Sequence, residues 1–249
     1  MPIEAAEWFA RISLMTWLTI PSARPPREAA ETLLVWHKRG YGLMLWRDKE
    51  DELGELLPAD GRVVITVGEY PGYAKACNWL TRAAFELDKT CDWVVTGGDD
   101  TLPDARNPED IAAILTLHFA GTFGVMQPTG DRFAGGSIDR ICGSPWLGRE
   151  FCWRMYQGTG PYWPEYSHMF VDQELFEVAK QLGVLWQRRD LTHQHNHFMR
   201  VAGTDQAEAR TPPPHLVQPN SAGHWQFYKD LFTRRQRAGF PGSEPIAHE

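Results

Sequence analysis

The sequence lacks the features of several common protein classes. Its four cysteines show no Cys-x-x-Cys spacing, so neither a zinc site nor a disulfide framework is indicated, and we expect reduced thiols in an intracellular protein. The N-terminal apolar run is too short and too polar to span a bilayer, and no basic region precedes it, so we expect neither secretion nor a membrane anchor. A net charge of -7 disfavours a nonspecific polyanion binder, although it is compatible with a local basic groove. A cytoplasmic location is the resulting expectation.

Internal repeats are also absent, and the chain of 249 residues is long enough for one large domain. Its N-terminal half alternates short apolar runs of β type with segments of helical periodicity, which indicates right-handed crossovers and a mostly parallel sheet. We therefore predict an α/β, Rossmann-like layer structure. The predicted strands are residues 12–20, 41–46, 62–67 and 93–96, and the predicted helices between them are residues 27–39 and 73–88.

The second half continues this alternation and then changes character. A helix follows the Asn-Pro-Glu-Asp sequence at residues 107–110, a strand is predicted in GTFGVMQP, and residues 129–148 form a glycine-rich loop. A further helix covers residues 168–183, and three histidines alternate in LTHQHNHF. Residues 203–224 resemble a linker, and a short aromatic and basic helix follows them. We place one domain at residues 11–200 and a C-terminal extension packing on it at residues 201–249.

The sequence CDWVVTGGDDTLPD, residues 91–104, places two adjacent carboxylates directly after a predicted buried strand. Open α/β sheets bind their ligands at the carboxyl ends of such strands. Carboxylate oxygens are hard ligands that suit Mg²⁺ or Mn²⁺ bridging to a diphosphate. The alternative is a solvated turn, because Asp beside Gly and Pro is common in turns. The chemistry predicted here is a metal and phosphate site.

The order of four pieces resembles a GT-A glycosyltransferase of the family-2 type, which uses nucleotide-diphosphate sugars. They are the loop PSAR after the first strand, the helix GYAKACNWLTRAA, the carboxylate turn, and an Asp-bearing helix after an aromatic loop. The resemblance implies a GT-A fold with a C-terminal helical extension. The QxxRW signature of processive synthases is absent, which favours transfer of a single sugar. The resemblance implies donor contacts from Pro21, Ser22, Arg24, Asp48, Asn78 and Asp99, with a UDP-sugar as the favoured donor.

Further roles come with the same resemblance. It implies that Asp100 binds Mn²⁺ or Mg²⁺ and that His195 or His193 completes the metal site. Three alternating histidines are also compatible with an ordinary exposed strand. Gly98 stands where the family often has an acid, which leaves the ribose contact open. Asp172 is the candidate catalytic base for an inverting displacement, with helix capping as its alternative. The expected acceptor wall consists of Trp146, Arg149, Tyr162 and Trp163.

Two acceptors are compatible with this interpretation. One is a hydroxymethylated base of phage DNA, flipped out of the duplex in the host cytoplasm, and the other is a saccharide or a lipid-linked cell-surface intermediate. Alternatives from other classes are a nucleotidyltransferase, for which a glycine-rich basic phosphate loop is missing, and a non-catalytic sugar-nucleotide binder. The candidate phosphate contacts for DNA are Arg132, Arg140, Arg149, Arg154, Lys229, Arg234, Arg235 and Arg237.

Overall fold

A computed structural model describes residues 15–247, and within them the chain builds a seven-stranded sheet in the order β3-β2-β1-β4-β7-β6-β8. Strands β1, β2, β3 and β4 are parallel, β6 is parallel to β8, and β7 is antiparallel to both of its neighbours. These strands are β1 (Trp17–Pro21), β2 (Gly42–Arg47), β3 (Val63–Val67), β4 (Trp93–Val95), β6 (Val125–Pro128), β7 (Trp146–Gly148) and β8 (Leu185–Arg188).

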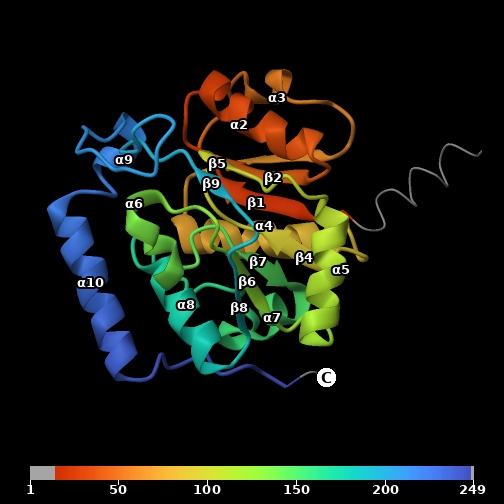
Figure 1. Cartoon of the computed structure of the whole chain (residues 1–249), viewed down its shortest axis with the longest axis vertical. Helices are drawn as coiled ribbons and strands as arrows, with labels where there is room; N and C mark the ends of the chain where they lie inside the picture. Colours follow the sequence, from red (N-terminus) through yellow and green to blue (C-terminus); the bar gives the residue numbers. More distant parts are fainter. Residues whose placement is uncertain (1–14, 248–249) are drawn as a thin grey trace, which may run out of the picture.

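Helices cover both faces of this sheet, and alternation along each strand explains why (Figure 1). On one face, Leu18 and Ile20 of β1 pack with α2 (Pro26–Lys38), α3 (Leu53–Leu56) and α5 (Pro108–Phe119). On the other face, Trp17 and Met44 pack with α4 (Tyr73–Leu87), α7 (Arg149–Arg154) and α8 (Val171–Gln181). The result is a three-layer α/β structure with two apolar cores.

The C-terminal part adds one long helix to this layered body. Helix α10 (Ala222–Arg237) begins where the Ser221 side chain accepts a hydrogen bond from the backbone of His224, and it runs along one side of the molecule (Figure 1). Its residues Tyr228 and Leu231 are buried in the same core as α8. The remaining short elements are α6 (Phe133–Gly136), α9 (Pro214–Val217) and two 3₁₀ turns, Ser137–Arg140 and Tyr156–Gly158.

The predicted α/β, Rossmann-like class with a mostly parallel sheet flanked by helices is confirmed. Two differences concern short strands. Strand β7 lies within the segment predicted as a loop, and β5 (Thr101–Leu102) pairs with β9 (Gln194–His195) in a separate small sheet. The first residues of the predicted strand 12–20 and of the predicted domain 11–200 lie outside the described residues. None of the helices formed by residues 15–247 has the length and apolar character needed to cross a membrane.

Candidate functional site

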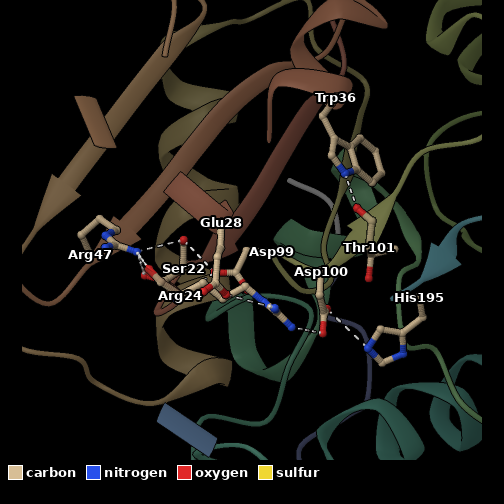
Figure 2. Close-up of polar contacts among 9 residues, drawn as sticks. All are labelled: Ser22, Arg24, Glu28, Trp36, Arg47, Asp99, Asp100, Thr101 and His195. Carbon is tan, nitrogen blue, oxygen red and sulfur yellow. Dashed lines mark hydrogen bonds and ion pairs between the residues drawn. The ribbon is translucent and has the colours of Figure 1, made fainter. Parts of the chain in front are cut away.

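The carboxylate turn meets the loop after β1 at the carboxyl edge of the sheet (Figure 2). The hydroxyl of Ser22 donates to Oδ2 of Asp99 at 2.8 Å, and the backbone N–H of Arg24 donates to the same oxygen at 3.2 Å. The Arg24 guanidinium also lies 3.3 Å from Oδ1 of Asp99. Burial and the neighbouring Asp100 raise the pKa of Asp99. Asp99 therefore ties the turn to the β1 loop.

Asp100 has two cationic or potentially cationic partners from distant parts of the chain. A guanidinium nitrogen of Arg24 donates to Oδ2 at 2.8 Å, and Nε2 of His195 lies 3.4 Å from Oδ1 (Figure 2). His195 reaches the turn because β9 pairs with β5 directly after Asp100, with Thr101 opposite His195. Burial opposes ionisation of Asp100, but His195 and Arg24 outweigh it and lower its pKa to about 2. Asp100 is consequently a carboxylate at neutral pH.

A buried arginine holds the β1 loop in this position. One guanidinium nitrogen of Arg47 donates to the carbonyl of Ser22 at 2.8 Å and to that of Arg24 at 3.0 Å. The other terminal nitrogen pairs with Asp51. Sequence patterns indicated no role for Arg47 or Asp51. An arginine at the end of a buried strand, four residues before an aspartate, is the signal that could have predicted this support.

The turn lies in a cleft of about 800 Å³ that also receives the first turn of α8. Asp172 sits there, with Oδ1 accepting the backbone N–H of Gln173 at 3.0 Å, and burial raises the pKa of Asp172. Asp100 and Asp172 are thus two carboxylates in one cleft whose environments shift their pKa values in opposite directions. The expected site residues that line this cleft are Pro21, Ser22, Arg24, Asp48, Asp99, Asp100, Tyr162, Asp172, His193 and His195.

Comparisons with known proteins identify no family for this chain. No protein-family model matches it, and no curated protein matches it. One similar solved structure is a glycosyltransferase involved in the glycosylation of the major capsid of PBCV-1, with 14% sequence identity over 55% of this chain and 60% of that chain, and a TM-score of 0.32. The chain therefore matches less than two thirds of the length of that protein. A likeness at this level establishes neither a family nor an activity.

Three residues of the expected acceptor wall lie outside the cleft, because the fold uses them for support. Trp146 is fully buried in β7, where it contacts the Tyr41 ring. The guanidinium of Arg149 donates to three backbone carbonyls around the end of α4, so it is not free to bind an acceptor. The ring of Trp163 lies under the guanidinium of Arg235. Their expected place in the acceptor wall is corrected by these contacts.

The expected donor contact of Asn78 is corrected in the same way. Asn78 is buried in α4, and its side-chain amide donates to the carbonyl of Tyr162 at 2.8 Å and accepts from the Tyr162 backbone N–H at 3.1 Å. Both ends of the amide are used, so Asn78 positions Tyr162 and does not line the cleft. Tyr162 is the one residue of the expected acceptor wall that does.

The two candidate metal histidines differ sharply in environment. His193 is buried, its Nδ1 donates to the backbone carbonyl of Ser144 at 3.0 Å, and burial lowers its pKa to about 4. No contact joins His193 to Asp100 among the described residues, whereas His195 lies beside that carboxylate. His195 is therefore the histidine positioned to share an ion with Asp100.

Within residues 15–247 no three His, Cys, Asp or Glu side chains converge in a way that would enclose a metal ion. The pair formed by Asp100 and His195 nevertheless fits an ion such as Mg²⁺ or Mn²⁺. Such ions are commonly held by one or two side chains together with substrate phosphates and water, so a closed protein cage is not required. The carboxylate is the ligand type that both ions prefer, and the imidazole, which is more typical of transition-metal ions, favours Mn²⁺ over Mg²⁺.

The sequence did not predict that the C-terminal extension reaches the cleft. His215 and His224, in the segment interpreted as a linker, line the cleft together with Trp225, the first residue of the predicted helix. His168 and Phe170, just before α8, lie in the same wall. The proline-rich composition before this segment predicts an extended chain, and only long-range packing of α10 brings the segment to the cleft.

Proposed function

We propose that this chain is a metal-dependent glycosyltransferase that moves one sugar from a nucleotide-diphosphate sugar to an acceptor hydroxyl, with a UDP-sugar as the favoured donor. One observation carries the proposal. The ionised Asp100, at the end of a buried strand, contacts both Arg24 of the β1 loop and His195, in a cleft that also holds Asp172. The proposed site is therefore assembled from the ends of β1 and β4, from β9 and from α8.

The donor half of the cleft would be the part lined by Ser22, Arg24 and Asp48. The diphosphate would lie near Arg24, whose planar guanidinium suits phosphate oxygens. Asp100 and His195 would hold the divalent ion, which supplies charge neutralisation for the leaving diphosphate when it is bound. Asp48 follows β2 and lines the same cleft, a position suited to the nucleoside.

Asp172 is proposed as the general base. The acceptor hydroxyl would pass its proton to the Asp172 carboxylate while its oxygen bonds to the anomeric carbon, and the bond from that carbon to the diphosphate oxygen would break with its electron pair leaving on the diphosphate. A single displacement of this kind inverts the anomeric configuration. The raised pKa of Asp172 makes it a better proton acceptor than an ordinary exposed carboxylate.

The fold favours a saccharide over a DNA base as the acceptor. Three of the arginines that were expected to contact phosphates are occupied within the fold: Arg132 pairs with Asp139, Arg149 donates to backbone carbonyls, and Arg235 pairs with a buried acid. Duplex DNA is bound mainly through cationic contacts to its phosphates. The loss of these three contacts weakens the case for DNA.

The test of the donor site is a thermal-shift experiment with Asp100→Asn. Wild-type protein is expected to be stabilised by a UDP-sugar in the presence of Mn²⁺, by about 2.7 kcal/mol when the donor is at 100 times its Kd. Asp100→Asn should lose most of this stabilisation, because the ion that joins protein and diphosphate loses its carboxylate. Asp110→Asn, an exposed acid in α5, is the control and should behave as wild type. An undiminished Mn²⁺-dependent shift in Asp100→Asn would contradict the proposal.

Arg24 provides a second prediction, on metal binding without donor. Its guanidinium lies 2.8 Å from Asp100 and so competes with an ion for the same carboxylate. Arg24→Gln is expected to tighten Mn²⁺ binding to the free protein about tenfold, equivalent to about 1.4 kcal/mol, and to weaken donor binding. Arg27→Gln, at a position in the first turn of α2 where the side chain is 82% exposed, should change neither. Mn²⁺ titration followed by electron paramagnetic resonance measures the first effect, and unchanged Mn²⁺ affinity in Arg24→Gln would refute the competition.

A further inference from the structure

The cleft has a second wall, formed by two segments that are far apart in sequence. Residues 167–173 comprise the loop before α8 and the first turn of that helix, and residues 215–225 run from α9 into the start of α10. We call these two ranges the C-terminal wall. Its side chains share one continuous cleft with the carboxylate turn, and Asp172 is part of it. The wall therefore lies where a group that reacts at Asp172 has to bind.

The chemical character of the C-terminal wall differs from that of the donor half. Asp172 is its only charged side chain apart from histidine, whereas the donor half contains Arg24, Asp48, Asp99 and Asp100. Burial, together with nearby His215 and His224, lowers the pKa of His168, which favours a neutral ring at pH 7. The two ranges contain no lysine or arginine, and the ammonium of Lys229, which lies 4.7 Å over the Trp225 ring, does not line the cleft, so a phosphate has no ionic partner among the residues of this wall. It suits an uncharged ligand with hydroxyl groups.

Two polar atoms of this wall are buried without a hydrogen-bond partner among the described residues. They are Oε1 of Gln173, next to Asp172, and Nδ1 of His224 in the first turn of α10. Buried polar atoms are nearly always paired in folded proteins, so each such atom requires an explanation. Both residues line the cleft, and both atoms can accept a hydrogen bond from a hydroxyl group. A bound polyol would satisfy them.

Aromatic rings complete the wall beside the proposed base. Trp225 is 42% exposed, and its ring centre lies 5.8 Å from that of Phe170. Phe170 adopts a left-handed backbone conformation with φ of 67°, which is uncommon for a large side chain, and its ring contacts the rings of both Trp225 and Phe232. A pyranose ring presents a face of C–H groups that packs well on an indole surface.

We infer that the C-terminal wall is the acceptor subsite and that it takes a neutral saccharide. Trp225 supplies the packing surface for a sugar ring, and Gln173 and His224 accept hydrogen bonds from its hydroxyl groups. This inference rests on the proposed function and deepens it by naming the acceptor class. It also gives the C-terminal extension a direct part in specificity.

The test compares Trp225→Ala with Phe227→Ala, two aromatic residues in the first turns of the same helix. Phe227 is 63% exposed and does not line the cleft, so it is the matched control. Release of UDP from a panel of UDP-hexoses is measured with Mn²⁺ alone, with methyl and p-nitrophenyl hexosides, and with duplex DNA containing hydroxymethylcytosine. Some hexoside is expected to stimulate release by wild-type protein, and Trp225→Ala should raise the KM for that hexoside about tenfold. Its kcat, its hexoside-independent hydrolysis and its donor affinity should stay within about twofold.

Each other outcome has a distinct meaning. Stimulation by the DNA but by no hexoside, or donor hydrolysis that no hexoside stimulates, would overturn the saccharide class. An unchanged hexoside KM in Trp225→Ala would overturn the subsite. Should Trp225→Ala fail to fold, Gln173→Ala provides a second variant outside α10. A wild-type KM for the hexoside in Gln173→Ala would also contradict the acceptor subsite. Failure of the proposed function itself has another signature: no donor-induced stabilisation and no donor hydrolysis in wild-type protein.

Discussion

Asp172→Asn is expected to lower the rate of sugar transfer by roughly 10³-fold, within the range that a general base contributes. The amide keeps the size of the side chain and can still accept the hydrogen bond from the backbone N–H of Gln173, but it cannot take a proton from the acceptor. Donor affinity should stay within about twofold, because the donor contacts lie at Arg24 and Asp100. Transfer kinetics and donor titration measured on one preparation separate these two effects.

The same prediction has a pH dependence whose sign follows from the environment of Asp172. Burial disfavours its charged form and raises its pKa, so the active carboxylate is lost at a higher pH than for an exposed aspartate. As the pH falls through this raised pKa, the Asp172 carboxylate becomes protonated and kcat/KM for transfer should fall. Asp172→Asn should show no such acidic limb in its residual activity.

The control for this substitution is Glu177→Gln, which lies in α8 outside the cleft and should transfer at the wild-type rate. Equal losses of transfer and of donor binding in Asp172→Asn would indicate a structural role in place of proton acceptance. An Asp172→Asn enzyme with more than a tenth of wild-type activity would remove Asp172 from the mechanism.

Local patterns predicted the parts of the site that depend on one strand or one helix end. The carboxylate turn follows an apolar run of β type, and Asp172 occupies the first turn of an amphipathic helix, so both are visible within about ten residues. His195 was visible only as one of three alternating histidines. Its pairing opposite Thr101 depends on a contact across 94 positions, and the sequence pattern could not distinguish it from His193.

The residues whose roles were predicted wrongly depend on contacts between distant parts of the chain. Trp146 looked like a loop residue because β7 has only three residues, follows Pro145 and ends at Gly148. This segment forms a strand only by inserting antiparallel between β4 and β6. Arg149 and Asn78 carry polar groups that suit a ligand, but these groups satisfy backbone atoms within the fold. Amino-acid type indicates what a side chain can bind, and long-range packing decides whether it is free to do so.

Loss of the ion pair that attaches α10 to α8 is expected to lower the stability of the fold. Arg235 forms a bidentate ion pair with Glu174 of α8, with N···O distances of 2.8 and 2.7 Å, and Glu174 also accepts hydrogen bonds from the hydroxyls of Tyr156 and Tyr166. Both charged side chains are buried, at 6% and 1% exposure. Arg235→Met should therefore lower the free energy of unfolding by about 3–5 kcal/mol, because it leaves a buried carboxylate without its cation.

Urea denaturation measures this loss as a shift in the midpoint at constant slope. Arg234→Met, exposed on the preceding position of the same helix, should stay within about 0.5 kcal/mol of wild type. Combining Glu174→Gln with Arg235→Met should cost less than the sum of the two single changes, since no unpaired charge remains in the double variant. An Arg235→Met loss of stability below about 1 kcal/mol would show that the ion pair adds little.

Because α10 carries Trp225 and His224, a loosened helix should also raise the hexoside KM while donor affinity is retained. This effect would link the buried ion pair to acceptor binding.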